Sequence, residues 1–442
     1  MNRTTLRGHK KSGPELTTLA DPGLDAVLGG GPAPQRSALW ARLESPLSTY
    51  YLLVGTTAML LGTGLIMVLS ASSVGAIAAG NSEYMLFFKQ AQFAVLGLIG
   101  AFIASRLPVA FWRRISVPLL IGAICLQMLV FVPGLGLTVN GNRNWLALGP
   151  IQVQPSEFGK IALVIFGASI LSTKRKMLGR WRHALVPLVF PAGGLLLVLV
   201  LAGKDLGTCL VLGAIIVGVL WASGISGRLF GFAAVASGIL LGGMVATSGN
   251  RIERITTWID CTNVLACWQT SHGQAALADG GLGGLGLGGS RQKWLWLPEA
   301  HNDFIFAIIG EELGIGGTLM ILVLFALLAL ACYRVVMHSK DMFVRIATAG
   351  VMVWILVQAM INIASVIGLL PVIGIPLPLV SSGGSALVTT LAAIGMVVSF
   401  ARSEPNCRDA LAARPRMLRR SLSILSRRPS EVSVGAPARE SR

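Results

Sequence analysis

Long uninterrupted apolar blocks are the feature that most restricts how this chain folds. Several approach about 20 residues, the length of helix that crosses the hydrocarbon core of a bilayer. Of the 442 residues, 54% are hydrophobic and 12% charged, against roughly 25% charged in a soluble domain. Backbone groups cannot stay unpaired in lipid, so the blocks must be helices, and the weak alternation of a membrane barrel is absent. The sequence therefore predicts an all-α polytopic membrane protein.

Ten hydrophobic segments are expected to cross the membrane. They cover residues 51–71, 84–106, 113–133, 157–173, 184–202, 206–224, 228–248, 304–333, 343–369 and 384–401. Basic residues gather in the connections that are cytoplasmic when the N-terminus lies inside, most densely between Lys174 and Arg182, as the positive-inside rule requires. Both termini are then cytoplasmic, and a large extracytoplasmic loop, 249–303, joins helices 7 and 8. Its tryptophans favour a packed loop rather than a disordered one.

The chain divides into a membrane domain, 50–402, between two tails. Residues 1–49 are rich in Gly, Pro, Ser and Thr, and residues 403–442 are rich in arginine, so both are expected to be disordered and cytoplasmic. The net charge of +17 lies beside the expected spans and in the tails, where it favours anionic lipid headgroups. No compact basic domain is present to bind nucleic acid.

Polar groups near apolar spans are costly, and they often mark functional sites. The segment before the fourth helix ends in a proline, a capping hydroxyl from Ser156, and Glu157, which together indicate a helix start. Glu157 and Lys160 are three residues apart and can pair on one helix face. One interpretation is a capped helix with a neutralised charge. The other is that Arg143, Gln154 and Lys160 face an anionic, sugar-bearing substrate.

Asp303 begins the eighth helix and is the strongest catalytic candidate, with Glu299 and His301 just before it. An acid at a cavity mouth beside a histidine suits general-base chemistry, although an acid at a helix start also satisfies the helix dipole. Glu311 follows about 12 Å deeper, at 1.5 Å per residue, within roughly 80° of the same face. Glu312 falls on the opposite side.

Two further segments are irregular. Three prolines and repeated glycines interrupt residues 368–386, and such backbone is tolerated beside lipid when it lines a cavity. Ser381, Ser382 and the two glycines after them could offer backbone N–H groups to an anion. The turn Lys204-Asp205 is expected to be structural.

Other motifs carry less weight. Residues 281–286 match G-x-G-x-x-G, but no strand precedes them, so a mobile loop is the expectation rather than a nucleotide site. The five histidines lack metal-ligand spacing. A divalent cation, Mg²⁺ or Mn²⁺, held by Glu299 and Asp303 is compatible with the sequence but not required. Cys261 and Cys267 share the extracytoplasmic loop and are expected to form a disulfide.

Four stretches occur in the order and spacing of one known family. NRNWLALGPIQVQPSE, DLGT, SRQKWLWLPEAHNDFIFAIIGEELG and NIASVIGLLPVIGIPLPLVSSGGS resemble the SEDS family of shape, elongation, division and sporulation proteins, from about Tyr50 to Arg402. The third stretch is most similar to the members that act in division. Lys204, Ser382 and Cys261 depart from the family's usual residues, which puts local loop geometry in question.

The resemblance implies a glycosyltransferase that polymerises lipid II at the outer face of the cytoplasmic membrane, at the division septum. Asp303 would be the general base for the acceptor hydroxyl, and the reaction would invert the anomeric carbon. A class B penicillin-binding protein and other divisome membrane proteins would be partners. The candidate substrate-binding residues are Arg143, Gln154, Ser156, Glu157, Lys160, Glu299, His301, Asn302, Glu311, Ser381 and Ser382.

Two other functions stay open. A lipid II flippase would distribute charged groups through the membrane depth, whereas here they concentrate in the outer half. A scaffold that only activates a penicillin-binding protein would tolerate Asp303→Ala.

Overall fold

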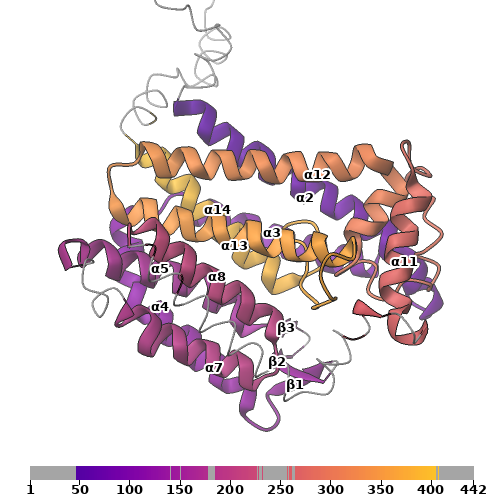
Figure 1. Ribbon diagram of the computed structural model, residues 1–442, viewed down its shortest axis with the longest axis horizontal. Coiled ribbons are helices and arrows are strands. Elements are labelled where there is room, and N and C mark those ends of the chain that lie inside the picture. The colour runs from indigo at the N-terminus through magenta and orange to yellow at the C-terminus, as the bar shows by residue number, and fades with distance from the viewer. Residues whose placement is uncertain are drawn as a thin grey trace, which may run out of the picture. The chain divides into compact units, whose positions relative to one another are not determined.

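A computed structural model describes residues 46–139, 141–149, 151–177, 185–225, 227, 231, 256, 258–260, 264–404 and 407. The described part is mostly helical (Figure 1). Its α-helices are α2 (Pro46–Ala78), α3 (Met85–Ala104), α4 (Val109–Met128), α5 (Pro155–Thr173), α7 (Gly194–Ala202), α8 (Leu206–Ala222), α11 (Val264–Gly280), α12 (Ile305–His338), α13 (Met342–Val366) and α14 (Gly384–Ser403). Shorter turns of helix are η1 (Leu129–Phe131), η2 (Arg175–Met177) and η3 (Leu188–Gly193).

Seven described helices are long and apolar enough to cross a membrane: α2, α3, α4 with η1, α5, α12, α13 and α14. Two shorter apolar helices, Leu188–Ala202 and Leu206–Ala222, correspond to the fifth and sixth expected spans. The seventh expected span, 228–248, lies outside the described residues, as do most of both tails. The count of ten spans and the placement of the termini therefore stay predictions.

The expected loop 134–156 is wrong in part, because it contains a small sheet. Strands β1 (Gly136–Val139), β2 (Asn142–Leu148) and β3 (Ile151–Val153) pair antiparallel in that order, with Leu146 opposite both Gly136 and Val153. Gly141 and Gly149 have positive φ, as tight hairpin turns require. Buried and less buried residues alternate along β2, as in a strand, but its sequence, NRNWLAL, does not alternate polar and apolar residues and so did not indicate it.

The first helix is also longer than expected. Its apolar run continues through small residues that do not interrupt a helix, so α2 extends to Ala78 instead of stopping at residue 71. It ends where Gly80 adopts a φ of +73°.

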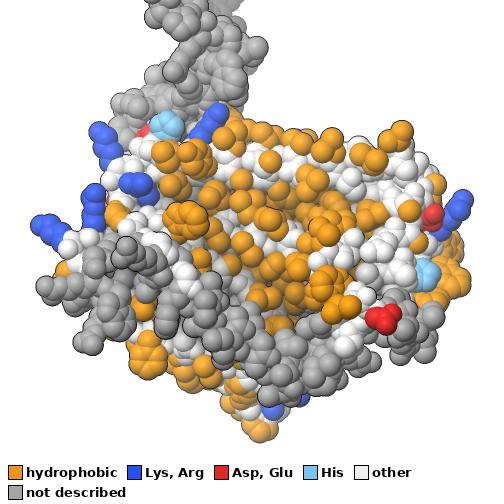
Figure 2. Space-filling model, viewed as in Figure 1, with side chains coloured by type: hydrophobic (Ala, Val, Ile, Leu, Met, Phe, Trp, Pro, Cys, Tyr) orange, Lys and Arg blue, Asp and Glu red, His pale blue; other side chains and the backbone are white. Residues whose placement is uncertain are grey.

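Successive helices alternate in direction, so the helix bundle has two ends. Polar contacts between helices lie at both of them. At the first end, which we call the Arg402 end, the pairs are Arg113 with Asp341, Arg334 with Ser48 and Arg402 with Ser105. At the other, the Asp303 end, they are Ser70 with Glu312, Gln90 with Ser381 and Gln154 with Asp205. Apolar side chains cover the middle of the face in Figure 2, as lipid contact requires.

The core lies around α5, α13 and α14, which are more buried than the other long helices. Trp354 of α13 and Phe400 of α14 are among the largest fully buried side chains. Close approach depends on glycine where a side chain has no room. A Cβ at Gly395 of α14 would lie 2.3 Å from the Ala101 carbonyl oxygen of α3. This packed centre supports the residues at the Asp303 end.

Candidate functional site at the Asp303 end

The structure places Asp303 two residues before the start of α12 at Ile305, where it lines a small pocket. Asn362 of α13 and residues 372–375 of the loop before α14 complete part of the pocket wall. Asp303 is half-buried, and a Cβ at Gly374 would lie 3.6 Å from its Oδ2 atom. That distance is an ordinary van der Waals contact, so space alone does not require glycine here; the φ of +79° at Gly374 does favour it.

Three consecutive carbonyl groups hold the backbone at Asp303. The Asn362 side chain donates to the Asp303 carbonyl at 2.8 Å, and the Ser381 hydroxyl donates to the Asn302 carbonyl at 2.7 Å. The Ser382 N–H donates to the His301 carbonyl at 3.0 Å. The contacts come from α13 and from the loop before α14, so two segments distant from residues 301–303 in sequence fix this turn of chain.

The loop before α14 is itself tied to α3 by Gln90, which is buried. Gln90 donates to the Ser381 carbonyl and accepts from the Gly383 N–H, each at 3.2 Å. The N–H groups of Ser381 and Ser382 are engaged by Leu377 and His301. The expectation that this backbone binds an anion is therefore wrong for these N–H groups. Sequence analysis missed Gln90, although a polar residue inside an apolar span was the available signal.

Polar side chains surround Asp303 along its own loop. Asn302 donates to the exposed carboxylate of Glu299, whose φ of +55° is strained for a residue with a side chain. Burial lowers the pKa of His301, and the nearby Glu299 carboxylate partly opposes that shift. His301 is therefore neutral at neutral pH, so its imidazole presents a dipole rather than a fixed positive charge.

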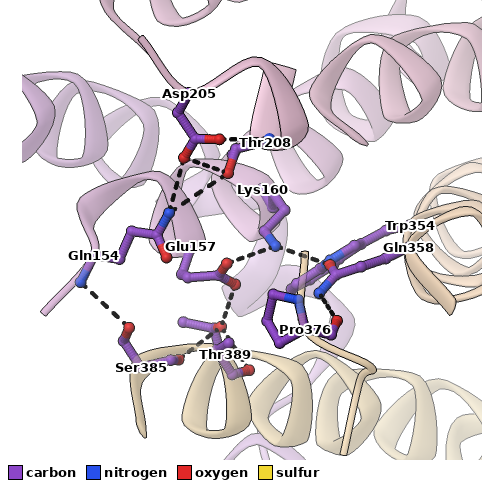
Figure 3. A network of polar contacts seen from close by, with 11 residues as sticks. Gln154, Glu157, Lys160, Asp205, Thr208, Trp354, Gln358, Pro376, Ser385 and Thr389 are labelled. Atoms are coloured by element: carbon purple, nitrogen blue, oxygen red, sulfur yellow. Dashed lines mark hydrogen bonds and ion pairs between the residues drawn. The ribbon is translucent and has the colours of Figure 1, made fainter. Parts of the chain in front are cut away.

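A second group of predicted residues meets where α5 and α8 begin (Figure 3). Asp205 caps α8 by accepting from the Thr208 N–H at 2.8 Å, as the structural interpretation of its turn implied. The Gln154 side chain joins the two helix starts by donating to Asp205 at 3.0 Å. Ser156 does not cap α5, because the helix begins at Pro155 and its N-cap is Gln154. The Ser156 hydroxyl is buried without a hydrogen-bond partner in the described structure.

Glu157 and Lys160 form the expected pair, with Nζ and Oε1 2.8 Å apart and side chains 3% and 2% exposed. Lys160 also donates to Gln358 at 3.0 Å and lies 5.0 Å from the Trp354 ring centroid. Thr389 donates to the other Glu157 oxygen at 3.4 Å. Figure 3 shows these groups converging from α5, α13 and α14. They form a neutral, closed network, which agrees with the structural interpretation of the pair.

Arg143 is held away from the pocket lining. Its guanidinium donates to the Val130 carbonyl at 2.9 Å and to the Phe131 and Val132 carbonyls at 3.3 Å. These carbonyls end the helix formed by α4 and η1, so the positive charge satisfies a helix C-terminus.

The two glutamates of α12 also lie apart from the pocket lining, and both are buried. Glu311 accepts from the Ser290 hydroxyl at 2.5 Å and from the Arg291 N–H at 2.7 Å. Glu312 pairs with Lys293 at 3.2 Å. The glycine-rich motif 281–286 packs against the same turn of α12, because the Leu285 N–H donates to the Glu311 carbonyl. The expected mobile loop is therefore an ordered contact.

The helix α11 orders part of the loop 249–303 by packing against α12, although Trp258, Trp294 and Trp296 of that loop are exposed. Trp268 stacks on Trp296 with ring centroids 5.7 Å apart and donates to the Trp296 carbonyl. Cys267 is disulfide-bonded, whereas its expected partner Cys261 lies outside the described residues, so that pairing stays a prediction. In the described ranges, no group of three or more His, Cys, Asp or Glu side chains could hold a metal ion.

Comparison with known proteins gives one consistent result. The family model described as Cell cycle protein, which covers FtsW, RodA and SpoVE, matches residues 51–406. A Mycobacterium tuberculosis protein named probable peptidoglycan glycosyltransferase FtsW is 39% identical over 93% of this chain and 80% of its own length. Stage V sporulation protein E of Bacillus subtilis is 38% identical over 79% of this chain and 96% of its own length.

Solved structures agree with the sequence relatives. A chain from a study of how a peptidoglycan synthase complex coordinates polymerization and crosslinking matches with a TM-score of 0.67 and 26% identity. The match covers 80% of this chain and 97% of that chain. The rod shape determining protein RodA of Thermus thermophilus matches with a TM-score of 0.60 and 27% identity, over the same shares of the two chains.

Proposed function

Because the chain belongs to the FtsW, RodA and SpoVE family of cell cycle proteins, we propose that it is a peptidoglycan glycosyltransferase. It polymerises lipid II at the outer face of the cytoplasmic membrane, with the Asp303 end facing outward. The names of the relatives from Mycobacterium tuberculosis and the peptidoglycan synthase complex support this activity. The relative named FtsW, 39% identical over 93% of this chain, supports a role at the division septum.

The pinned backbone at Asp303 is the observation that carries the proposal. Its carbonyl and the two before it are engaged by Asn362, Ser381 and Ser382, so the backbone has little freedom while the carboxylate borders a pocket. A general base must be held in a fixed place relative to the proton it removes. The hydrogen bonds to the carbonyls of residues 301–303 hold the Asp303 backbone in such a fixed place.

In the proposed reaction, Asp303 accepts the proton of the GlcNAc 4-hydroxyl. The hydroxyl oxygen bonds to the anomeric carbon of the other chain while the bond from that carbon to undecaprenyl pyrophosphate breaks. Single displacement inverts the carbon, and the pyrophosphate departs with the bonding electrons. The activated donor carries its own leaving group, so the protein has to orient two amphiphilic substrates and remove one proton.

The neighbouring polar groups have smaller roles in this proposal. Glu299, His301 and Asn302 line the approach to Asp303 and bind sugar hydroxyls or amides. A Mg²⁺ or Mn²⁺ ion, if required, would reach Glu299 and Asp303 and offset the charge of the pyrophosphate. Gln154, Glu157 and Lys160 have a structural role in this proposal, because they hold α5 to α8 and α13 through the partners that already engage them.

The proposed partner is a class B penicillin-binding protein that crosslinks the new strands, together with other divisome membrane proteins. The structural match to a peptidoglycan synthase complex supports this partner. A lipid II flippase is the alternative function. The ion pairs Glu157–Lys160 and Lys293–Glu312 both lie toward the Asp303 end instead of along a path through the bundle, which favours the enzyme.

The test is polymer formation from lipid II by the purified protein with its cognate synthase, whose transpeptidase is blocked. Asp303→Asn should abolish polymer, since an amide accepts no proton. Asp279→Asn is the matched control, because Asp279 is an exposed carboxylate on neighbouring α11, and it should retain activity. Polymer from Asp303→Asn at the native rate would rule out Asp303 as the base. If the native protein makes no polymer, translocation of labelled lipid II across vesicles tests the flippase.

A further inference from the structure

A break in α12 determines where Asp303 lies. Gly314 interrupts this helix with a φ of +65° and a ψ of −161°, a conformation that is essentially restricted to glycine. At 1.5 Å per residue, an unbroken α12 would be about 50 Å long. The stretch of α13 from Met342 to Asn362 is only about 30 Å long on the same basis.

With these lengths, two straight helices could not bring Asp303 and Asn362 into contact. The helix α12 ends at His338, close to where α13 begins at Met342, and residues 339–341 join the two. A straight α12 would therefore carry Asp303 about 20 Å past Asn362. Yet Asn362 donates to the Asp303 carbonyl at 2.8 Å. The turn of the chain at Gly314 accounts for this difference, so residues 305–313 are a separate helical segment that returns Asp303 to the pocket.

The glycine-rich loop takes over the backbone hydrogen bonds that this break removes. The N–H groups of Leu285 and Gly286 donate to the carbonyls of Glu311 and Glu312, at 2.9 and 3.0 Å. On the other side of the break, the Ile315 N–H donates to the Gly281 carbonyl at 3.0 Å. The loop therefore substitutes for the missing turn of helix, and the carbonyls of Glu311 and Glu312 are paired.

Glycines in the loop make this contact possible. A Cβ at Gly280 would lie 1.9 Å from the Gly310 carbonyl oxygen, and one at Gly284 would lie 2.3 Å from the Glu312 carbonyl oxygen. A Cβ at Gly314 would lie 2.6 Å from the Gly284 nitrogen. Backbone packs directly on backbone here, which no larger residue permits.

The side chains of both glutamates hold the same junction. Glu311 binds the loop through Ser290 and Arg291. Glu312 is 1% exposed, accepts from Ser70 of α2 at 2.6 Å, and pairs with Lys293 of the loop at 3.2 Å. A buried carboxylate is costly unless it is paired and hydrogen-bonded. The free-energy cost of burying the Glu311 and Glu312 carboxylates is therefore offset only while the loop stays in place.

We propose that residues 281–293 and 311–314 form a positioning bracket that sets the location of Asp303, with Glu312 and Gly314 as positioning residues. The inference rests on the proposed glycosyltransferase activity. None of the bracket residues lines the pocket, so damage to the bracket displaces the base without removing a contact to substrate. Displacement by about 1 Å lowers turnover on the order of 100-fold, while the KM for lipid II stays nearly unchanged.

Gly314→Ala is the first test, with Gly316→Ala as its matched control. Both glycines lie in α12, but a Cβ at Gly316 meets nothing within 4 Å. The Gly314 variant should lose kcat on the order of 100-fold with little change in KM, and the Gly316 variant should behave as the native protein. A native kcat for Gly314→Ala, or an equal loss in both variants, would overturn the proposal.

Hydrogen exchange of the full chain in nanodiscs gives a readout independent of activity. In the native protein, the amides of Leu285, Gly286 and Ser382 should be protected by the hydrogen bonds that they donate. Gly314→Ala should expose all three, while residues 315–333 stay protected as evidence that the helix is folded. Fast exchange at Leu285 and Gly286 in the native protein would overturn the bracket. Equal protection of Ser382 in the Gly314→Ala variant and in the native protein would also overturn the bracket. This readout does not depend on polymer formation, so it holds even if the proposed glycosyltransferase activity is not found.

The double variant Glu312→Gln/Lys293→Met provides a conservative rescue. Glu312→Gln alone leaves the Lys293 ammonium group, 5% exposed, without its charged partner. Removing both charges should restore kcat toward the native value if the pair acts by holding the loop. A double variant less active than Glu312→Gln would show that the charge itself is needed, which contradicts a positioning role.

Discussion

Replacing Lys160 with methionine tests whether the network at the start of α5 is a closed structural pair. Methionine has a similar length and no charge, so the volume is kept while the ammonium group is lost. The native Lys160 lies 2.8 Å from Glu157 and 3.0 Å from Gln358. After the change, the Glu157 carboxylate keeps the 3.4 Å hydrogen bond from the Thr389 hydroxyl. A carboxylate that is 3% exposed then has no countercharge.

The expected cost follows from this burial. Removing one partner of a buried ion pair destabilises a protein by about 3–5 kcal/mol, because the remaining charge stays desolvated. With both side chains at most 3% exposed, solvent does not screen the loss. Removing both charges in Glu157→Gln/Lys160→Met should cost less than the single change, since no uncompensated charge remains.

The assay is thermal unfolding of the protein in detergent. Its readout is the fraction of protein that remains monodisperse at each temperature. Lys160→Met should unfold at a lower temperature than the double variant. Arg113→Met is the control, because the Arg113–Asp341 pair is 46% and 40% exposed, and such surface pairs contribute about 0–1 kcal/mol. If Lys160→Met is as stable as the double variant, or if Arg113→Met is equally destabilising, the network is not a closed buried pair.

Two further outcomes are expected. Gly203→Ala should lower the unfolding temperature, because its Cβ would lie 2.0 Å from the Asn144 side-chain oxygen. The control Gly213→Ala should leave the unfolding temperature unchanged, because its Cβ meets nothing within 4 Å. Equal effects of the two changes would refute the steric argument. Because burial lowers the pKa of His301 from its ordinary 6.5, the folded state favours the neutral ring. This contribution to stability is complete above pH 6.5 and is lost as the pH falls through the lowered pKa. Unfolding temperature measured against pH should therefore decline less on the acid side for His301→Gln than for the native protein, and parallel curves would contradict the shift.

Some features follow from local sequence because their cause is local. An apolar run of sufficient length has to be helical in lipid, so the spans could be predicted from composition and length, including the short turn at Lys204 and Asp205. The spacing of Glu157 and Lys160 puts them on one helix face, and the pair formed as expected. The strand β2 has no such local signal, because its sequence, NRNWLAL, does not alternate polar and apolar residues.

The roles of the polar residues depended on contacts between distant segments. Arg143, Glu311 and the hydroxyl of Ser381 engage backbone groups elsewhere in the chain, and no periodicity identifies those partners. Gly314 looks like any glycine in an apolar run. Its break becomes visible only when the loop at 281–286 supplies the hydrogen bonds that the helix gives up. Hydropathy and residue spacing thus determined which segments are helices, whereas tertiary structure decided where Asp303 lies, because a buried polar group is placed by whichever partner can satisfy it.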